Sequence, residues 1–369
     1  MTPIEFRRRL HAYPELSFRE EGTARFISDC LAAEGIEHRS IARTGILSKI
    51  EGRGDLRRAV VLRADIDALP IREEANVAWR SRNEGVMHAC GHDIHAAVLF
   101  GVLQRLRREA DFEGTVFGLF QPAEECNPGG ASLVLAENPF EGYDVAAVVG
   151  EHVEAGLAVG TLGFCAGKFM ASNDELRFTV RGRGGHAAMR ATLKDPVTAA
   201  ADLILRLSEL NTDDCIVSTG RVTADGATNV VPDEVKTEGT MRTFDEAVRI
   251  RAKRRIVEIA QHIDCRYGVE TEVDIDEGYP CVVNDRELTA AARLLAEEHF
   301  RVADLKPRAT SEDFGRYSVR YPSLFYRLGV GENSGATHTS LFEPDERAID
   351  TGVDFMCLLA KKFIVHENE

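Results

Sequence analysis

The sequence lacks the basic excess, the long apolar runs and the paired cysteines that mark several classes of protein. Sixty acidic residues stand against 45 basic ones, and the net charge of −15 argues against binding to nucleic acid and, more weakly, to an anionic membrane surface. The longest apolar runs, such as Val145–Val149, are far too short to span a bilayer. No apolar stretch follows the charged start of the chain, so we expect no signal peptide. Eight cysteines without a Cys-x-x-Cys pair favour reduced thiols and a cytoplasmic location.

What is present is the ordinary composition of a folded protein. The 369 residues are 44% hydrophobic and 28% charged, and this length favours two domains. Short apolar runs separated by helical stretches predict an α/β domain with a largely buried sheet. The clearest predicted strands are Ala59–Leu62, Thr115–Phe120, Val145–Val149 and Leu324–Leu328.

A different pattern occupies the third quarter of the chain. Residues Glu175–Val180 and Val269–Ile275 alternate apolar and polar side chains, which is typical of strands with one solvent-exposed face. Two stretches with apolar residues at helical spacing lie between them. We therefore predict that residues 174–283 form an inserted α+β domain with an antiparallel sheet, and that residues 1–173 and 284–369 form the larger domain.

Groups able to bind a metal follow three of the predicted strands. Asp65 and Asp67 follow the first, Glu124 and Glu125 the second, and His152 the third. In open α/β sheets, ligands bind beyond the carboxyl ends of the strands. Because neighbouring side chains outside a helix diverge, one of the two adjacent glutamates can hold a metal while the other faces an activated water. A solvated acidic turn is the alternative for this pair.

The segment His88–His95 holds three histidines, a cysteine and an aspartate. Imidazole and thiolate suit zinc and similar ions, and carboxylates extend the choice to manganese. Apolar residues at helical spacing follow, so the segment is predicted to be a loop that enters a helix. Cys90 and His92 can then converge on one ion, and Asp93 can orient a ligand. His95 is either part of this site or an ordinary core histidine.

The glycine-rich segment Gly182–His186 lies in the predicted inserted domain. It has no G-x-G-x-x-G spacing and follows alternating strand residues, which disfavours dinucleotide binding. Its glycines would let the backbone approach a ligand and predict that His186 sits in a tight turn. An exposed histidine in a plain glycine turn is the alternative. The chain also has no G-x-S-x-G segment of a serine hydrolase.

Six segments carry a resemblance over nearly the whole chain, and they are Leu10–Leu16, Arg63–Pro70, His88–His95, Gln121–Glu125, Gly184–Ala188 and Thr310–Phe314. Together they resemble the M20 metallopeptidase family. The match is to its amidohydrolase branch, which holds N-acyl-amino-acid hydrolases such as hippurate hydrolase and N-acetyldiaminopimelate deacetylase. The resemblance implies a catalytic domain of the α/β class with a mixed, mainly parallel sheet. It also implies an inserted lid that often dimerises, so we expect a homodimer.

The resemblance also implies roles for single residues. It implies two divalent metal ions (zinc, manganese, cobalt or nickel) and a ligand set of Cys90, His92, Glu125, His152 and His338. Glu124 matches the general base. His186 matches a lid histidine that helps to bind the scissile carbonyl, often from the dimer partner. Asn229 and Arg242 match lid positions that hold the substrate carbonyl or carboxylate.

The chain departs from the usual pattern of the branch at a few positions. Asp65 stands where related peptidases carry a histidine, which leaves Asp67 as a support behind the ligands. Arg190 and Ala191 replace a common proline and histidine, and Glu151 replaces an apolar residue. None of these departures removes a ligand. Those that border the expected pocket leave the substrate open.

We therefore expect a dinuclear metal-dependent amidohydrolase that cleaves N-acyl amino acids to a carboxylic acid and a free amino acid. Glu124 would take a proton from water and return it to the leaving amine. His186 would stabilise the oxyanion from the lid. A dipeptidase or an N-carbamoyl-amino-acid hydrolase on the same frame is an alternative. A metal- or ligand-binding relative without catalysis is another, against which the intact Glu124 argues.

Overall fold

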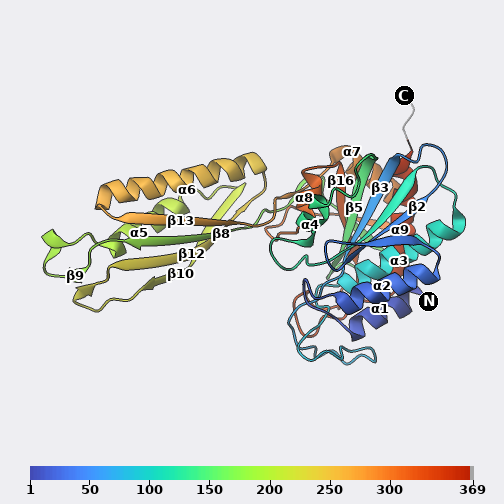
Figure 1. Ribbon diagram of the computed structural model, residues 1–369, viewed down its shortest axis with the longest axis horizontal. Helices are drawn as coiled ribbons and strands as arrows, with labels where there is room; N and C mark the ends of the chain where they lie inside the picture. Colours follow the sequence, from blue (N-terminus) through green and yellow to red (C-terminus); the bar gives the residue numbers. More distant parts are fainter. Residues whose placement is uncertain (366–369) are drawn as a thin grey trace. The chain divides into compact units, whose positions relative to one another are not determined.

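The computed structural model describes residues 1–365, and the chain divides into two compact units (Figure 1). Unit 1 comprises Met1–Gly167, Val283–Lys306 and the chain from Asp313 onward. Unit 2 comprises Lys168–Val282 and Pro307–Glu312. Each unit has its own cluster of buried apolar side chains.

The short segment Pro307–Glu312 marks a difference from the predicted ranges, which left it in the larger domain. The N–H of Ala171 bonds to the carbonyls of Arg308 and Thr310, at 3.1 and 3.0 Å. These backbone contacts join the segment to unit 2. The expected lid and dimerisation role of residues 174–283 stays a prediction.

Unit 1 is built on an eight-stranded sheet in the order β1-β2-β4-β3-β5-β16-β6-β15. Its strands are β1 (Glu37–Ile41), β2 (Gly45–Glu51), β3 (Arg58–Asp65), β4 (Thr115–Gln121), β5 (Asp144–Glu154), β6 (Thr161–Phe164), β15 (Arg301–Asp304) and β16 (Ser323–Gly329). Strands β4, β3, β5 and β16 are parallel neighbours, whereas β1, β2 and β6 add antiparallel pairs. The predicted mixed, mainly parallel sheet is confirmed.

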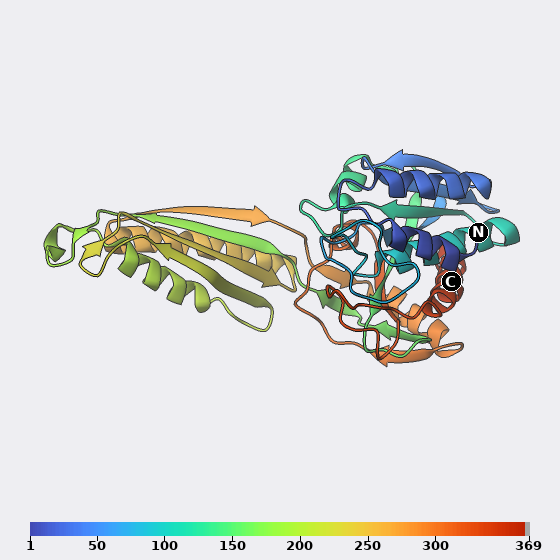
Figure 2. The same cartoon turned by 90° about the horizontal axis from the view of Figure 1, so that it is seen from below.

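Helices cover both faces of this sheet, which explains why its central strands are nearly continuous apolar runs (Figures 1 and 2). Helices α3 (His92–Glu109) and α9 (Ala348–Ile364) pack against each other and against β3. The short helices α4 (Gly130–Ala136) and α8 (Gly315–Ser318) lie on the opposite face. The remaining helices of unit 1 are α1 (Pro3–Ala12), α2 (Glu21–Ala33) and α7 (Arg286–Glu297). Within residues 1–365, no helix is long and apolar enough to cross a membrane.

Unit 2 contains an antiparallel sheet in the order β10-β12-β8-β13. Its longer elements are β8 (Asp174–Arg181), α5 (Pro196–Ser208), β10 (Cys215–Ala224), β12 (Glu234–Thr243), α6 (Glu246–Tyr267) and β13 (Glu270–Glu277). Leu176, Phe178 and Val180 of β8 are buried in the cluster that both helices share. Glu175 and Arg177 alternate with them and are exposed, as a one-sided strand requires.

Several short elements complete the chain. They are β7 (Gly167–Met170), β9 (Gly185–His186), a 3₁₀ helix (Arg190–Thr192), β11 (Val230–Val231) and β14 (Val282–Asn284). Strands β9 and β11 pair with each other in an antiparallel ribbon. This ribbon carries His186, one of the predicted site residues.

Candidate metal centre

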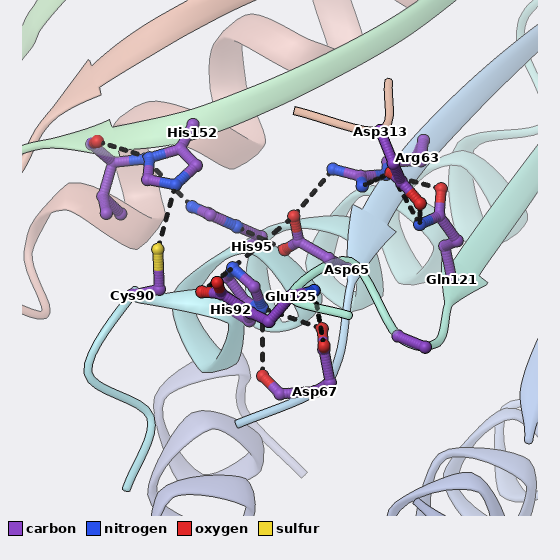
Figure 3. A network of polar contacts seen from close by, with 12 residues as sticks. Arg63, Asp65, Asp67, Cys90, His92, His95, Gln121, Glu125, His152 and Asp313 are labelled. Carbon is purple, nitrogen blue, oxygen red and sulfur yellow. Dashed lines mark hydrogen bonds and ion pairs between the residues drawn. The ribbon is translucent and has the colours of Figure 1, made fainter. Parts of the chain in front are cut away.

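Parallel strands bring three groups of polar side chains to one edge of the sheet of unit 1. Asp65 is the last residue of β3 and Gln121 the last residue of β4, and His152 lies on β5 two residues before its end. Because β3, β4 and β5 are parallel neighbours, their carboxyl ends meet at the same edge. Figure 3 shows the side chains that follow these strands gathered around Cys90 and His92.

The loop before α3 delivers two of the predicted ligands, and it depends on one glycine. Gly91 has φ = +85°, and a Cβ at this position would lie 2.6 Å from Cγ2 of Val153. Only glycine meets both conditions without strain. His92 is the first residue of α3, and the Sγ of Cys90 lies 3.3 Å from Nε2 of His152.

Two groups of three candidate ligands share the thiol of Cys90. One consists of Cys90, His92 and His152, and the other of Cys90, Glu125 and His338; within each, the ligand atoms lie within 4.8 Å of one another. Nε2 of His338 is 3.2 Å from the sulfur of Cys90 and 3.4 Å from Oε1 of Glu125. All five predicted ligands thus converge, and one sulfur lies in both groups.

The two buried imidazoles are oriented by partners outside the centre. Nδ1 of His92 lies 2.9 Å from the carbonyl of Asp67, and Nδ1 of His152 lies 2.7 Å from the carbonyl of Val153. A carbonyl oxygen only accepts, so Nδ1 donates in both rings. Nε2 then points toward the centre, which is the arrangement typical of metal-ligating histidines.

The donor atoms fit a divalent metal. Nε2 of His92 and Oε1 of Glu125 are buried, lie 3.9 Å apart, and have no hydrogen-bond partner within residues 1–365. An unsatisfied buried polar group costs about 1–3 kcal/mol, which a bound cation would remove. Burial, reinforced by Glu125, raises the pKa of the Cys90 thiol to about 12, so a thiolate there needs a cation to form. Sulfur, imidazole and carboxylate donors together suit zinc and similar ions.

The carboxylate of Asp67 contacts one residue from each of the two groups of candidate ligands. Its Oδ1 lies 3.1 Å from Nδ1 of His92, and its Oδ2 accepts the N–H of Glu125 at 2.9 Å and the hydroxyl of Ser17 at 2.7 Å. Burial alone would raise the pKa of Asp67, but the bond with His92 brings it below its ordinary value. The residue is therefore placed as a support for one ligand ring and for the backbone of another ligand.

Asp65 and His95 lie beside the centre and are already engaged. The carboxylate of Asp65 lies 2.6 Å from Nδ1 of His95 and 2.7 Å from NH1 of Arg63. The other nitrogen of His95 accepts the N–H of Val153 at 2.9 Å. Burial would raise the pKa of Asp65, but the charges of His92 and Arg63 hold it well below its usual range. Of the two alternatives for His95, the structure favours a hydrogen-bonded core histidine.

Asp93 does not contact a predicted ligand through the hydrogen bonds that the structure shows. Its Oδ2 accepts from Nε of Arg7 at 2.6 Å and lies 2.9 Å from Nδ1 of His11, both on α1. Burial would raise the pKa of Asp93, but Arg7 and His11 hold it well below its ordinary value. Through these two bonds Asp93 connects α1 to the start of α3, and its expected role in orienting a metal ligand stays a prediction.

A buried network behind β3 escaped the sequence analysis. NH2 of Arg63 donates to Asp313 at 2.9 Å, and the amide of Gln121 donates to the same carboxylate. The N–H of Ala131, at the start of α4, donates to Asp313 as well. An arginine directly after an apolar strand was the available signal, since a fully buried arginine needs an anionic partner.

Glu124 lies in unit 1, with its ligand atom within 4.8 Å of those of His92 and Glu125, whereas His186, Asn229 and Arg242 belong to unit 2. His186 ends the short strand β9, which pairs with β11, and it begins a tight turn in which its carbonyl accepts the N–H of Met189 at 2.8 Å. A Cβ on Gly184 would lie 2.2 Å from the carbonyl oxygen of Val231, so this glycine serves the close approach of two chain segments. The carbonyl of Asn229 accepts the N–H of Ala187 at 2.9 Å, which places Asn229 beside His186.

Arg242 lies on β12 of the same unit. Its NH1 donates to the hydroxyl of Ser311 at 3.2 Å. Burial lowers the pKa of this guanidinium, although an arginine stays charged in proteins. Arg242 thus offers a partly buried cation, as a carboxylate-binding residue requires.

Comparisons with known proteins agree on one family. The sequence profile of Peptidase family M20/M25/M40 matches residues 61–362. The chain is 36% identical to the N-acetyl-L-cysteine deacetylase of Bacillus subtilis (strain 168), over 99% of this chain and 89% of that protein. It is 34% identical to the N-acetyldiaminopimelate deacetylase of Anoxybacillus flavithermus, over 96% and 95%. A crystal structure from Bacillus subtilis, described as a dinuclear metal-binding peptidase from the M20 family, matches with a TM-score of 0.87 and 34% identity, over 98% of this chain and 97% of that one.

Replacing Asp67 by alanine is expected to weaken metal binding by about 10–100-fold, because it removes the carboxylate contact with the His92 ring and the acceptor of the Glu125 N–H, and leaves only the backbone carbonyl of residue 67 to hold the ring. Competition with a chelator of known affinity measures the change. Ser17→Ala is the matched control, since it removes only the hydroxyl bond to Asp67. The control should bind metal nearly as the wild type does. An unchanged metal affinity in Asp67→Ala would show that the contacts of this carboxylate with His92 and Glu125 have no role in holding metal.

Proposed function

The chain belongs to the Peptidase family M20/M25/M40, and on that basis we propose that it is a metal-dependent amidohydrolase acting on N-acyl amino acids. The products are a carboxylic acid and a free amino acid. The observation that carries the proposal is the group formed by His92, Glu124 and Glu125, whose ligand atoms lie within 4.8 Å of one another next to Cys90. This group places two candidate metal ligands, His92 and Glu125, beside a further carboxylate, that of Glu124, which can act as a base. Deacetylases of N-acylated amino acids align with nearly the whole chain, which supports the substrate class.

Two divalent ions (zinc, manganese, cobalt or nickel) are proposed to be held by Cys90, His92, Glu125, His152 and His338. When bound, such ions supply Lewis-acid activation of water and of the amide carbonyl. The chain's own contribution is to keep these donors on rigid elements. Cys90 and His92 flank the start of α3, and His152 lies on β5. Asp67 keeps the ring of His92 and the backbone of Glu125 in place.

Glu124 is proposed to move the proton. The residue is only 7% exposed, so its carboxylate has little contact with bulk water. The carboxylate accepts a proton from the attacking water and later returns it to the nitrogen of the leaving amine. Its neighbour Glu125 faces Nε2 of His338 and of His92, so the two adjacent glutamates take separate tasks.

Residues of unit 2 are proposed to bind the substrate. His186 donates a hydrogen bond to the carbonyl oxygen as negative charge develops on it. Arg242 and Asn229 hold the carboxylate or carbonyl of the amino acid, and the planar guanidinium of Arg242 suits a carboxylate. In this proposal His186 acts from a closing lid or from a second subunit.

The proposed enzyme is a cytoplasmic homodimer joined through the inserted domain. The eight cysteines are free thiols, which suits a reducing compartment. Strand β10 lies at an edge of the sheet of unit 2, and its Val222 is 53% exposed. An exposed sheet edge with an apolar side chain can pair with a second copy.

A panel of substrates tests the proposal. Protein loaded separately with zinc, manganese, cobalt or nickel should hydrolyse N-acetyl and N-benzoyl amino acids, measured as release of the free amine. Chelation should abolish turnover and re-metallation restore it. N-acetyl amino acid amides, which lack the carboxylate, should react more slowly because Arg242 has no anion to hold.

Carbamoyl amino acids and dipeptides belong in the same panel. A preference for carbamoyl amino acids would indicate an N-carbamoyl-amino-acid hydrolase, and a preference for dipeptides would indicate a dipeptidase. Full activity in protein that elemental analysis shows to be metal-free would end the proposal.

Glu124→Gln is expected to keep its metal and to lose about 10²–10⁴-fold in rate, the usual cost of removing a general base. Glu125→Gln is expected to show the opposite pattern and to lose metal first. Metal content and kcat of both variants are measured side by side. Near wild-type rates with two ions in both would refute the division of roles.

His186→Ala should lower kcat by on the order of 10²–10³-fold, as the loss of one oxyanion donor does elsewhere, and should leave metal content unchanged. If His186 acts across subunits, mixing the His186→Ala variant with the Glu124→Gln variant should restore activity. A hybrid dimer of the two variants holds one site in which both groups are intact. Proven subunit exchange without recovery would exclude action in trans. An unaltered rate in His186→Ala would exclude any catalytic role.

A further inference from the structure

Two glutamates lie near the start of helix α2, and the one that caps the helix is not the one at the N-cap position. Glu20 occupies the N-cap position, but its side chain makes no capping hydrogen bond. The carboxylate of Glu15 caps the helix instead, accepting the N–H of Gly22 at 3.2 Å and of Thr23 at 2.7 Å. A Cβ on Gly22 would lie 2.8 Å from that carboxylate, so glycine makes room for it. The side chain of Glu20 is therefore available for another contact.

Glu20 turns inward and bonds to the segment that follows β4. The residue is fully buried. Its Oε1 accepts the N–H of Ala123 at 2.9 Å, and its Oε2 accepts the hydroxyl of Thr44 at 2.6 Å. A buried carboxylate is costly unless hydrogen bonds satisfy it, so this position indicates a specific task.

Ala123 directly precedes Glu124 and has a strained backbone. Its φ is +52°, in the left-handed region that a residue with a Cβ rarely adopts. Such a conformation costs about 1–3 kcal/mol and persists only where the surroundings impose it. Here the N–H is held by Glu20 and the carbonyl accepts the N–H of Gly130 at 2.9 Å. A Cβ on Gly130 would lie 1.8 Å from the carbonyl oxygen of Pro122, so the turn is closed as tightly as glycine permits.

The other side of Glu124 is held in the same manner. The N–H of Glu125 donates to Asp67 at 2.9 Å. Glu124 thus lies between two backbone N–H groups, each held by a different buried carboxylate. The backbone sets the direction of the Cα–Cβ bond, so these two N–H contacts determine the direction in which the side chain of Glu124 leaves the chain.

We propose that Glu20 is a positioning residue for Glu124: by holding the N–H of Ala123, it keeps the turn in the left-handed conformation that aims the general base. The inference deepens the proposed function, since it assumes that Glu124 is the base. Without Glu20, Ala123 can relax toward negative φ and carry Glu124 away from its position. A displacement of about 1 Å can cost about 10²-fold in rate. The metal donor Glu125 keeps its own bond to Asp67, so the loss falls on kcat and not on metal content.

Three variants separate this role from general stability. Glu20→Met keeps the volume and loses both acceptors. Glu20→Gln keeps both contacts, since its oxygen can accept from Ala123 and its amide can donate to the Thr44 hydroxyl. Glu15→Met is the matched control, because the same substitution removes the two bonds that Glu15 makes to backbone N–H groups at the start of α2 and does not affect the bond to Ala123.

Glu20→Met is expected to lower kcat about 10²-fold with KM and both metal ions unchanged. Glu20→Gln should stay close to the wild-type kcat. Glu15→Met should lower the melting temperature and leave kcat as it is. Thr44→Val, which removes one of the two bonds of Glu20, should give an intermediate kcat and keeps the test open if Glu20→Met does not fold.

Hydrogen exchange of the Ala123 amide supplies a readout that needs no substrate. The amide should exchange faster in Glu20→Met than in the wild type, and at the wild-type rate in Glu20→Gln and Glu15→Met. If the wild-type protein hydrolysed no substrate of the panel, the proposed function would fail, and the exchange rates would still decide whether Glu20 holds the turn. Unchanged kcat and exchange in Glu20→Met, a loss of kcat that only follows a loss of metal, or an equal loss in Glu15→Met would overturn the inference.

Discussion

The candidate metal centre depends on carboxylates that are buried and yet kept ionised by partners from distant elements. Asp65 lies between Arg63 and His95, and Asp67 between His92 and the N–H of Glu125. Burial alone would raise the pKa of both acids, and their partners bring each below its ordinary value. A desolvated charge costs several kcal/mol unless it is paired and hydrogen-bonded. The ring of His92 and the backbone of Glu125 therefore depend on this network of charges and hydrogen bonds.

Accessibility differs between the two groups of candidate ligands that share Cys90. The side chain of His92 is 1% exposed, whereas that of His338 is 52% exposed. His338 has a φ of +62°, and its N–H bonds to the carbonyl of Ala89 at 2.8 Å, next to Cys90. The loop of His338 is thus tied to the loop of Cys90 by backbone as well as by side chain. Of the two histidines, only His338 has a side chain in substantial contact with solvent.

Much of the fold could be predicted because its signals are local. The alternation in Glu175–Val180 predicts a strand with one exposed face, and β8 has that burial pattern. The continuous apolar runs around Val116 and Val148 predict strands covered on both faces, as β4 and β5 are. The cluster His88–His95 and the adjacent glutamates indicate metal chemistry from residue type and spacing alone, and the structure brings them together.

The chemistry of the centre could be predicted from residue types and local patterns: the donor types, the strands that carry them and the acidic pair Glu124 and Glu125. How these groups are held depends on contacts that form only in the folded chain. Glu20 meets Ala123 across 103 residues, and Arg63 meets Asp313 across 250. A hydrogen bond between such distant residues leaves no periodicity and no local spacing, since it forms only when the strands align their carboxyl ends. For the same reason, the pairing of the strand that holds His186 and the bonds of Asp93 to α1 could not be predicted from the sequence.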